Sequence, residues 1–227
     1  MRRRFKDQLQ RLNYEMVLMG SLIERAVETA GELMETGDME AAQRLKAGDE
    51  EIDRKEREIE TMCMSLMLMQ PDATDLRFIS AALKMITDME RIADQASDIA
   101  EILTMHHEGE RLPFPSHLQQ MAKAASRMVH EAVEAYVTRD FLLARKVIEE
   151  DDAVDVLFDK VKSDILGLLD QFCRNGMLVD GQQLLDMLMI AKYLERSADH
   201  AVNIAEWVEY AMTGKHKGTN LQRPVKW

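Results

Sequence analysis

The chain has 227 residues, of which 46% are hydrophobic and 31% charged, a composition typical of a globular protein with a core of its own. Its formal net charge of −12 repels phosphate backbones, which argues against general nucleic-acid binding. The densest apolar run, residues 62–69, is far shorter than the roughly 20 residues needed to span a bilayer, so we expect a soluble chain.

Three helices are predicted in the first half of the chain. Apolar residues at helical spacing over 9–34 indicate a first helix that ends at Gly37. Asp38 is an N-cap candidate for a second helix, which must stop before Pro71 because proline lacks the amide hydrogen that a helix interior requires. A third helix is predicted over about 75–103, so the first half of the chain contains three long helices.

The second half repeats this plan after a segment rich in glycine and proline. Ser116 with Gln119 fits a capping box, and Asp180 with Gln183 is another, because in each pair the two side chains can satisfy backbone amides at a helix start. Three further helices are therefore predicted, over about 116–137, 140–172 and 180–212.

The predicted fold is all-α and consists of two tandem three-helix bundles. Helices of about 30 residues extend roughly 45 Å, so we expect long antiparallel rods. We assign residues 1–108 to the first repeat, 109–115 to the linker, 116–212 to the second repeat and 213–227 to a basic flexible tail.

An internal duplication supports this division. Glu90-Arg91-Ile92-Ala93-Asp94 returns 105 residues later as Glu195-Arg196-Ser197-Ala198-Asp199. Asp49 and Asp53 align with Asp151 and Asp155 at a shift of 102. Self-similarity over so long a period indicates that one structural unit is present twice.

The two cysteines lie among core-like residues of corresponding helices. Cys63 and Cys173 are therefore predicted to be buried free thiols, which fits a reducing compartment better than a disulfide does.

The duplicated segments carry paired carboxylates four residues apart, a spacing that places both side chains on one helix face. Such pairs occur on wet surfaces of ordinary acidic helices, where the repulsion costs only a few tenths of a kcal/mol. Their recurrence in both copies, however, favours oxygen-rich faces that could bind a hard cation or an iron or manganese cluster. The candidate metal ligands are Asp49, Asp53, Glu90, Asp94, Asp151, Asp155, Glu195 and Asp199.

Two alternatives to a metal site remain open in the sequence. Arg91 and Arg196 could neutralise these carboxylates as ion pairs, and His200 beside Asp199 could serve as a nitrogen ligand or as an ordinary helper residue. No glutamate is followed by histidine three residues later, which argues against a di-iron site of the ferritin type. The sequence also contains no Walker loop, no Gly-x-Ser-x-Gly elbow and no Cys-x-x-Cys pair, so no catalytic residues are predicted.

Together, an Asp-x-x-x-Asp motif followed by Glu-Arg-x-x-Asp in each duplicated half resembles the PhoU family of phosphate-signalling proteins. The resemblance covers nearly the whole chain. It implies a cytoplasmic, non-enzymatic negative regulator of phosphate uptake and of the phosphate-starvation regulon. Such a regulator couples the phosphate ABC transporter ATPase and permease to a sensor histidine kinase, and it meets the membrane only through these partners.

The same resemblance implies a homodimer and a multinuclear divalent metal or iron site on the eight carboxylates named above. Two other functions are compatible with the sequence. One is a metal-dependent enzyme or metal store built on the carboxylates, and the other is an accessory of a different phosphate or cation transporter.

Overall fold

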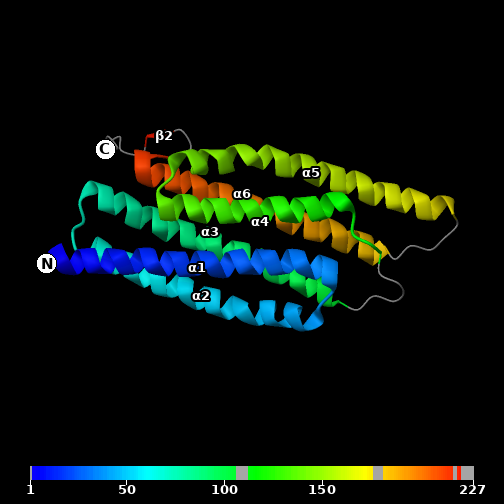
Figure 1. Ribbon diagram of the computed structural model, residues 1–227, viewed down its shortest axis with the longest axis horizontal. Helices are drawn as coiled ribbons and strands as arrows, with labels where there is room; N and C mark the ends of the chain where they lie inside the picture. The colour runs from blue at the N-terminus through cyan, green and yellow to red at the C-terminus, as the bar shows by residue number, and fades with distance from the viewer. Residues whose placement is uncertain (1, 106–111, 176–180, 217–218, 221–227) are drawn as a thin grey trace, which may run out of the picture.

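Six long helices account for most of the computed structural model, which describes residues 2–105, 112–175, 181–216 and 219–220. The first three helices form one antiparallel bundle and the next three form a second, with all six aligned along the long axis of the molecule (Figure 1). The helices are α1 (Arg2–Thr36), α2 (Met39–Met67), α3 (Ala73–Thr104), α4 (Ser116–Thr138), α5 (Phe141–Arg174) and α6 (Gly181–Thr213). The predicted all-α fold is confirmed.

Two pairs of helices join the bundles. α3 packs against α6, and α1 packs against α4. α1 and α4 are antiparallel, because Tyr136 near the end of α4 donates a hydrogen bond from its hydroxyl to the Asn13 side chain in the first half of α1. α3 and α6 are also antiparallel, because Asp88 contacts His200 whereas the later Asp98 contacts the earlier Tyr193. The two repeats therefore share one continuous core, whose largest fully buried side chains include Leu12, Met16, Met19, Ile23, Ile59, Leu66, Ile79, Met85, Ile86, Met89, Ile92 and Ile99.

Equivalent helix ends have equivalent backbone conformations in the two repeats. The α1–α2 turn has Gly37 at φ 64°, and the α4–α5 turn has Arg139 at φ 55°. The left-handed conformation suits glycine, and Arg139 adopts it with its guanidinium 4.2 Å from the centre of the Phe78 ring. Asp38 and Asp140 then cap α2 and α5 by accepting hydrogen bonds from two backbone amides each. The predicted Asp38 cap is confirmed.

Two predicted helix starts differ from the structure. Ser116 is the first residue of α4, and the cap position is Pro115, which makes no side-chain capping bond, so the predicted Ser116 capping box is wrong. α3 begins earlier than predicted, because Asp72 accepts hydrogen bonds from the amides of Thr74 and Asp75. The other predicted box includes Asp180, which lies outside the described residues.

The cysteine prediction is half right. Cys63 and Cys173 are both free, but only Cys63 is buried, whereas Cys173 is exposed in the last turn of α5. Apolar spacing continues to the end of α5, but Val161 is the last buried residue of that helix. The helix thus extends past the part of the bundle that could cover it (Figure 1).

After α6 the chain forms a short antiparallel pair of strands, β1 (Lys215–His216) and β2 (Thr219–Asn220). The described part of the predicted flexible tail therefore includes two short paired strands. The His216 ring stacks on Trp207 of α6 with the ring centres 3.9 Å apart. In the described part of the chain, no helix has an apolar stretch long enough to cross a membrane.

Candidate functional site

The four candidate ligands of the first repeat come together where α2 packs against α3. Asp49 and Asp53 lie on α2, Glu90 and Asp94 lie on α3, and we call these four residues the first acidic face. Burial raises the pKa of Glu90 to about 7, assisted by the charges of Asp94, Glu56 and Asp53. Burial also raises the pKa of Asp49, again with Asp94 as the strongest charged contributor. Carboxylates of two helices therefore repel one another across this surface.

The second repeat has the equivalent arrangement on α5 and α6. Asp151 and Asp155 lie on α5, Glu195 and Asp199 lie on α6, and these four residues form the second acidic face. Burial raises the pKa of Asp151 to about 6, and the Asp199 carboxylate opposite is the largest charged contributor. Burial and the nearby Glu195 likewise raise the pKa of Asp199. Each repeat thus gathers the predicted carboxylates on one surface.

Glu56 is an acidic neighbour that the sequence analysis missed. Its carboxylate accepts a hydrogen bond from the Thr87 hydroxyl at 3.2 Å, and it helps to raise the pKa of Glu90. The signal was present in the sequence, because Glu56 follows Asp53 by three residues and therefore lies on the same side of α2. The first acidic face thus borders a fifth carboxylate.

Basic side chains offset part of this charge. Arg91 opposes the rise in pKa of both Glu90 and Asp94. On the second face, Lys192 donates a hydrogen bond to Glu195. Because the pKa of Glu90 stays raised despite Arg91, neutralisation by that arginine is incomplete. The charge of Arg196 instead lowers the pKa of Asp98 in the first repeat. The alternative in which each arginine neutralises the carboxylates of its own motif is therefore only partly right.

Oxygen donors of this kind suit hard cations and iron or manganese, so donor type and charge fit the expected metal. Among the residues that the structure describes, however, no three His, Cys, Asp or Glu side chains lie close enough together to hold one metal ion. A metal would therefore require the carboxylate side chains of each face to converge further by rotation.

His200 has a different role from that of a ligand beside Asp199. Its Nδ1 lies 2.8 Å from Oδ1 of Asp88 on α3, and both side chains are almost completely buried. Asn203 donates a second hydrogen bond to the same oxygen at 3.2 Å. These contacts connect α3 of the first repeat to α6 of the second, so His200 joins the two repeats. Nothing in the sequence near Asp88 pointed to a partner 112 residues away.

A pseudo-symmetric contact lies further along the same helix pair. Tyr193 of α6 hydrogen-bonds to Asp98 of α3, and burial raises the pKa of both groups. The shift of 105 residues relates Asp88 to Tyr193 and Asp98 to Asn203. The two repeats thus meet through two equivalent polar contacts made by different residues.

Comparison with known proteins identifies the family. A family model described as PhoU domain matches residues 16–103 and 118–208, one match in each repeat. The chain belongs to the PhoU family. Both PhoU matches include the residues of an acidic face, so the acidic faces lie within the parts of the chain that define the family.

Relatives match over almost their full length. A protein of Clostridium acetobutylicum named phosphate-specific transport system accessory protein PhoU homolog is 31% identical over 221 residues, covering 96% of this chain and 99% of that protein. A protein of the same name from Aquifex aeolicus is 32% identical and covers 85% of each chain.

Solved structures agree with the fold. The crystal structure of PhoU from Pseudomonas aeruginosa has a TM-score of 0.85 at 30% identity, and the match covers 93% of this chain and all of that one. The phosphate transport system regulatory protein PhoU from Streptococcus pneumoniae has a TM-score of 0.84 at 25% identity, over 93% of this chain and 98% of that one. The duplicated bundle is therefore the PhoU fold.

Proposed function

We propose that this protein is a cytoplasmic negative regulator that couples a phosphate ABC transporter to a sensor histidine kinase. The observation that carries the proposal is the near full-length similarity to proteins named as phosphate-specific transport accessory proteins. A transporter conformation adopted at high phosphate would be relayed through the helical body to hold the kinase inactive. The protein would then repress the phosphate-starvation genes while phosphate is plentiful.

The physical character of the fold supports an adaptor. Helices of 29 to 35 residues present long exposed faces in both repeats, for example α2 in the first and α5 in the second. The two bundles are joined by buried contacts, among them the Asp88–His200 hydrogen bond. A rigid body of this kind can hold two partners at a fixed separation. Homodimerisation, expected from the family, would double the number of such faces.

The proposal includes a metal on each acidic face. The eight carboxylates already named would hold it. A bound divalent or iron centre would supply positive charge to surfaces on which these carboxylates repel one another. The raised pKa of Glu90 and of Asp151 supports this assignment, because both values reflect burial of the carboxylate first and the charge of neighbouring carboxylates second.

The adaptor part is tested in bacterial cells by deleting the gene and measuring alkaline phosphatase in rich phosphate. The expected result is loss of repression, restored by the wild-type gene on a plasmid. Co-purification of the tagged protein from high-phosphate cells should recover the transporter ATPase and the kinase. Normal repression in the deletion strain, together with recovery of a different transporter, would assign the protein to that other system.

The metal part is tested separately by elemental analysis of purified protein. Wild-type protein should retain metal, Asp94→Ala and Asp199→Ala should each lose the share held by one face, and Asp170→Ala serves as the control. Asp170 is an exposed carboxylate near the end of α5, so this control removes the same charge away from both faces. Metal-free wild-type protein would end the metal assignment, whereas oxygen- or peroxide-dependent turnover by iron-loaded protein would favour a metal enzyme.

A further inference from the structure

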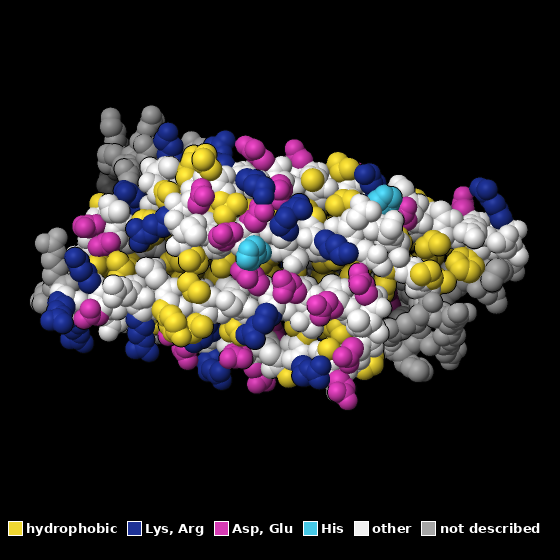
Figure 2. All heavy atoms as spheres, viewed as in Figure 1, with side chains coloured by type: hydrophobic (Ala, Val, Ile, Leu, Met, Phe, Trp, Pro, Cys, Tyr) yellow, Lys and Arg dark blue, Asp and Glu magenta, His cyan; other side chains and the backbone are white. Residues whose placement is uncertain are grey.

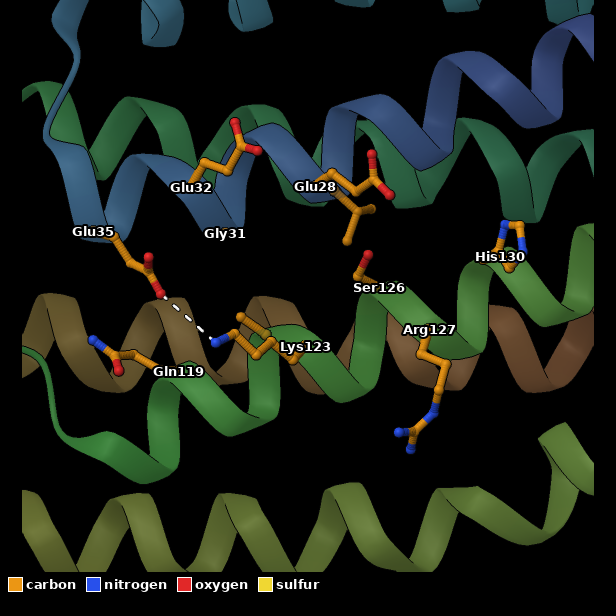
Figure 3. A pocket seen from close by; sticks show the side chains of 11 residues that line it. Glu28, Gly31, Glu32, Glu35, Gln119, Lys123, Ser126, Arg127 and His130 are labelled. Carbon is orange, nitrogen blue, oxygen red and sulfur yellow. Dashed lines mark ion pairs between the residues drawn. The ribbon is translucent and has the colours of Figure 1, made fainter.

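A groove of about 580 Å³ lies on the outer side of the molecule, between α1 of the first repeat and α4 of the second. Gly31 of α1 and Ala122 and Ser126 of α4 line it, and larger charged side chains stand along both of its sides (Figure 3). The volume is in the range of ligand-binding sites in proteins. The acidic faces lie on other helix pairs, so this groove is a separate feature.

The duplication explains why the groove is hollow. The shift of 102 residues relates Gly20 to Ala122, and Gly31 to Val133. At one crossing of α1 and α4, Val133 packs so closely over Gly20 that a Cβ placed on Gly20 would lie 2.4 Å from its Cγ1. At the equivalent crossing Gly31 stands in place of the valine, and a Cβ there would lie 3.9 Å from the Cβ of Ala122. The space that Val133 fills at one end is therefore left open at the other.

The two sides of the groove carry opposite charges. Acidic side chains line the α1 side and basic ones the α4 side, as the spheres along these two helices show (Figure 2). The acidic residues are Glu28, Glu32 and Glu35, and the basic residues are Lys123, Arg127 and His130. Spacings of three and four residues keep each set on one side of its helix.

These charges leave the centre of the groove accessible. Glu28 and Glu32 point away from α4, and Arg127 points toward α5 (Figure 3), where its Nε lies 3.5 Å from Glu150. At one end of the groove His130 pairs with Glu24 of α1 at 3.2 Å. At the other end Lys123 pairs across the groove with Glu35 at 3.9 Å, and both of these side chains are more than half exposed. An exposed pair at that distance contributes little and can rearrange easily.

Shape and charge together define the occupant. The α1 side extends over residues 27–35, about 12 Å or roughly two turns of helix, and the α4 side extends over residues 119–130, about 16 Å or roughly three turns. One row of side chains on a partner helix would enter the groove over Gly31. Basic residues on one flank would reach Glu28 and Glu32 along the outer edge of α1, and acidic residues on the other would face the exposed Lys123. A second copy centred on the groove fits less well, because a two-fold axis through the groove would place groove against groove and leave both empty.

We infer that the α1–α4 groove is a docking site for an amphipathic helix of another protein, one with an apolar ridge, a basic flank and an acidic flank. Gly31 is the residue that makes room for the ridge. The site lies across the boundary between the repeats, so an occupant would contact both.

The test uses a fluorescent, helix-stabilised peptide of about 12 residues with a leucine ridge, lysines along one flank and glutamates along the other. A second peptide with glutamate on both flanks is the charge control. Binding is measured by fluorescence anisotropy with wild-type protein and with Gly31→Leu and Gly48→Leu. Gly48 lies in a separate groove between α1 and α2, and a side chain there meets no atom within 4 Å, so Gly48→Leu controls for an added leucine.

The expected result is saturable binding of the mixed-charge peptide that Gly31→Leu weakens about tenfold or more, whereas Gly48→Leu leaves it unchanged. The all-glutamate peptide should bind more weakly to wild-type protein, because it repels the α1 side. Circular dichroism of each variant checks that the helices persist. The assay contains neither transporter nor kinase, so its outcome is independent of the function proposed above.

Three outcomes would overturn the inference. The first is absence of saturable binding up to about 1 mM peptide. The second is equal binding by wild-type protein and Gly31→Leu. The third is a wild-type dimer in sedimentation that Gly31→Leu converts to monomer, which would assign the groove to a second copy of the chain.

Discussion

Gly20 and Gly31 provide a matched pair of alanine substitutions with opposite expected effects on stability. Both residues lie inside α1, so replacing either one by alanine should gain about 1 kcal/mol of helix propensity. At Gly31 the new methyl group meets only the Cβ of Ala122, at an ordinary contact distance of 3.9 Å. Gly31→Ala should therefore raise the free energy of unfolding by about 1 kcal/mol.

At Gly20 the same methyl group would lie 2.4 Å from Cγ1 of Val133, well inside the usual carbon–carbon contact of about 3.5–4.0 Å. Overpacking of this kind costs about 1–3 kcal/mol, which exceeds or cancels the gain in propensity. Gly20→Ala should then be neutral to about 2 kcal/mol less stable than wild type. The two variants should differ in melting temperature by roughly 2–12 °C for a chain of this size.

Urea denaturation followed by circular dichroism measures both free energies, and Val133→Ala completes a double-mutant cycle. Val133→Ala alone should cost about 2 kcal/mol, because Val133 is a buried side chain of the core. In that background the nearest Val133 atom left to meet the Gly20→Ala methyl is the Cβ at 3.5 Å, so the substitution should stabilise. Equal effects of Gly20→Ala in the two backgrounds would refute the close approach of α1 and α4.

Three further predictions follow from buried or repelling groups. His200→Ala should lower the free energy of unfolding by about 3 kcal/mol, because it leaves the buried Asp88 carboxylate without its main partner; an unchanged denaturation midpoint would contradict this. Cys173 should react with a thiol reagent in the folded protein, whereas Cys63 should react only on unfolding, because burial raises the pKa of Cys63 to about 12. Equal reaction rates of the two cysteines would show that Cys63 is accessible. In metal-free protein at pH 8, Glu90→Gln should stabilise by about 1 kcal/mol after allowance for solvent screening. Folding raises the pKa of Glu90 from 4.5 to about 7, so the stability linked to its protonated form is present below pH 4.5 and is lost as the pH rises through 7. Glutamine stays neutral at every pH and therefore does not lose this stability. A difference in stability between variant and wild type that did not change with pH would contradict this explanation.

The helices were predictable because their signals are local. Apolar spacing places a helix, and Asp38 starts one because its side chain reaches amides two and three residues away. The prediction of a capping box at Ser116 was wrong because it also depended on a local pattern alone. Its spacing to Gln119 fits a capping box, yet the helix includes Ser116, and the cap position is Pro115. A local pattern cannot decide between adjacent residues where both could start the helix.

The candidate site was predictable only within each helix. Four-residue spacing correctly placed Glu90 beside Asp94, but the approach of Asp49 from α2 depends on how the helices pack. The Asp88–His200 contact was not predictable, since nothing in either segment specifies the other. Cys173 was placed wrongly because α5 keeps its apolar spacing beyond the part that its neighbours cover.

The separation in sequence between Asp88 and His200 also has a consequence for synthesis of the chain. All three helices of the first repeat leave the ribosome before α4 does, and they can pair with one another through short turns. The side of α3 that carries Asp88 is covered only when α6 has been synthesised, more than 100 residues later. At about 5–20 residues per second that delay is roughly 5–20 s, during which a nascent half-protein presents an uncovered, partly apolar helix face. Chaperone contact during translation should therefore be concentrated on α3 and end when α6 arrives.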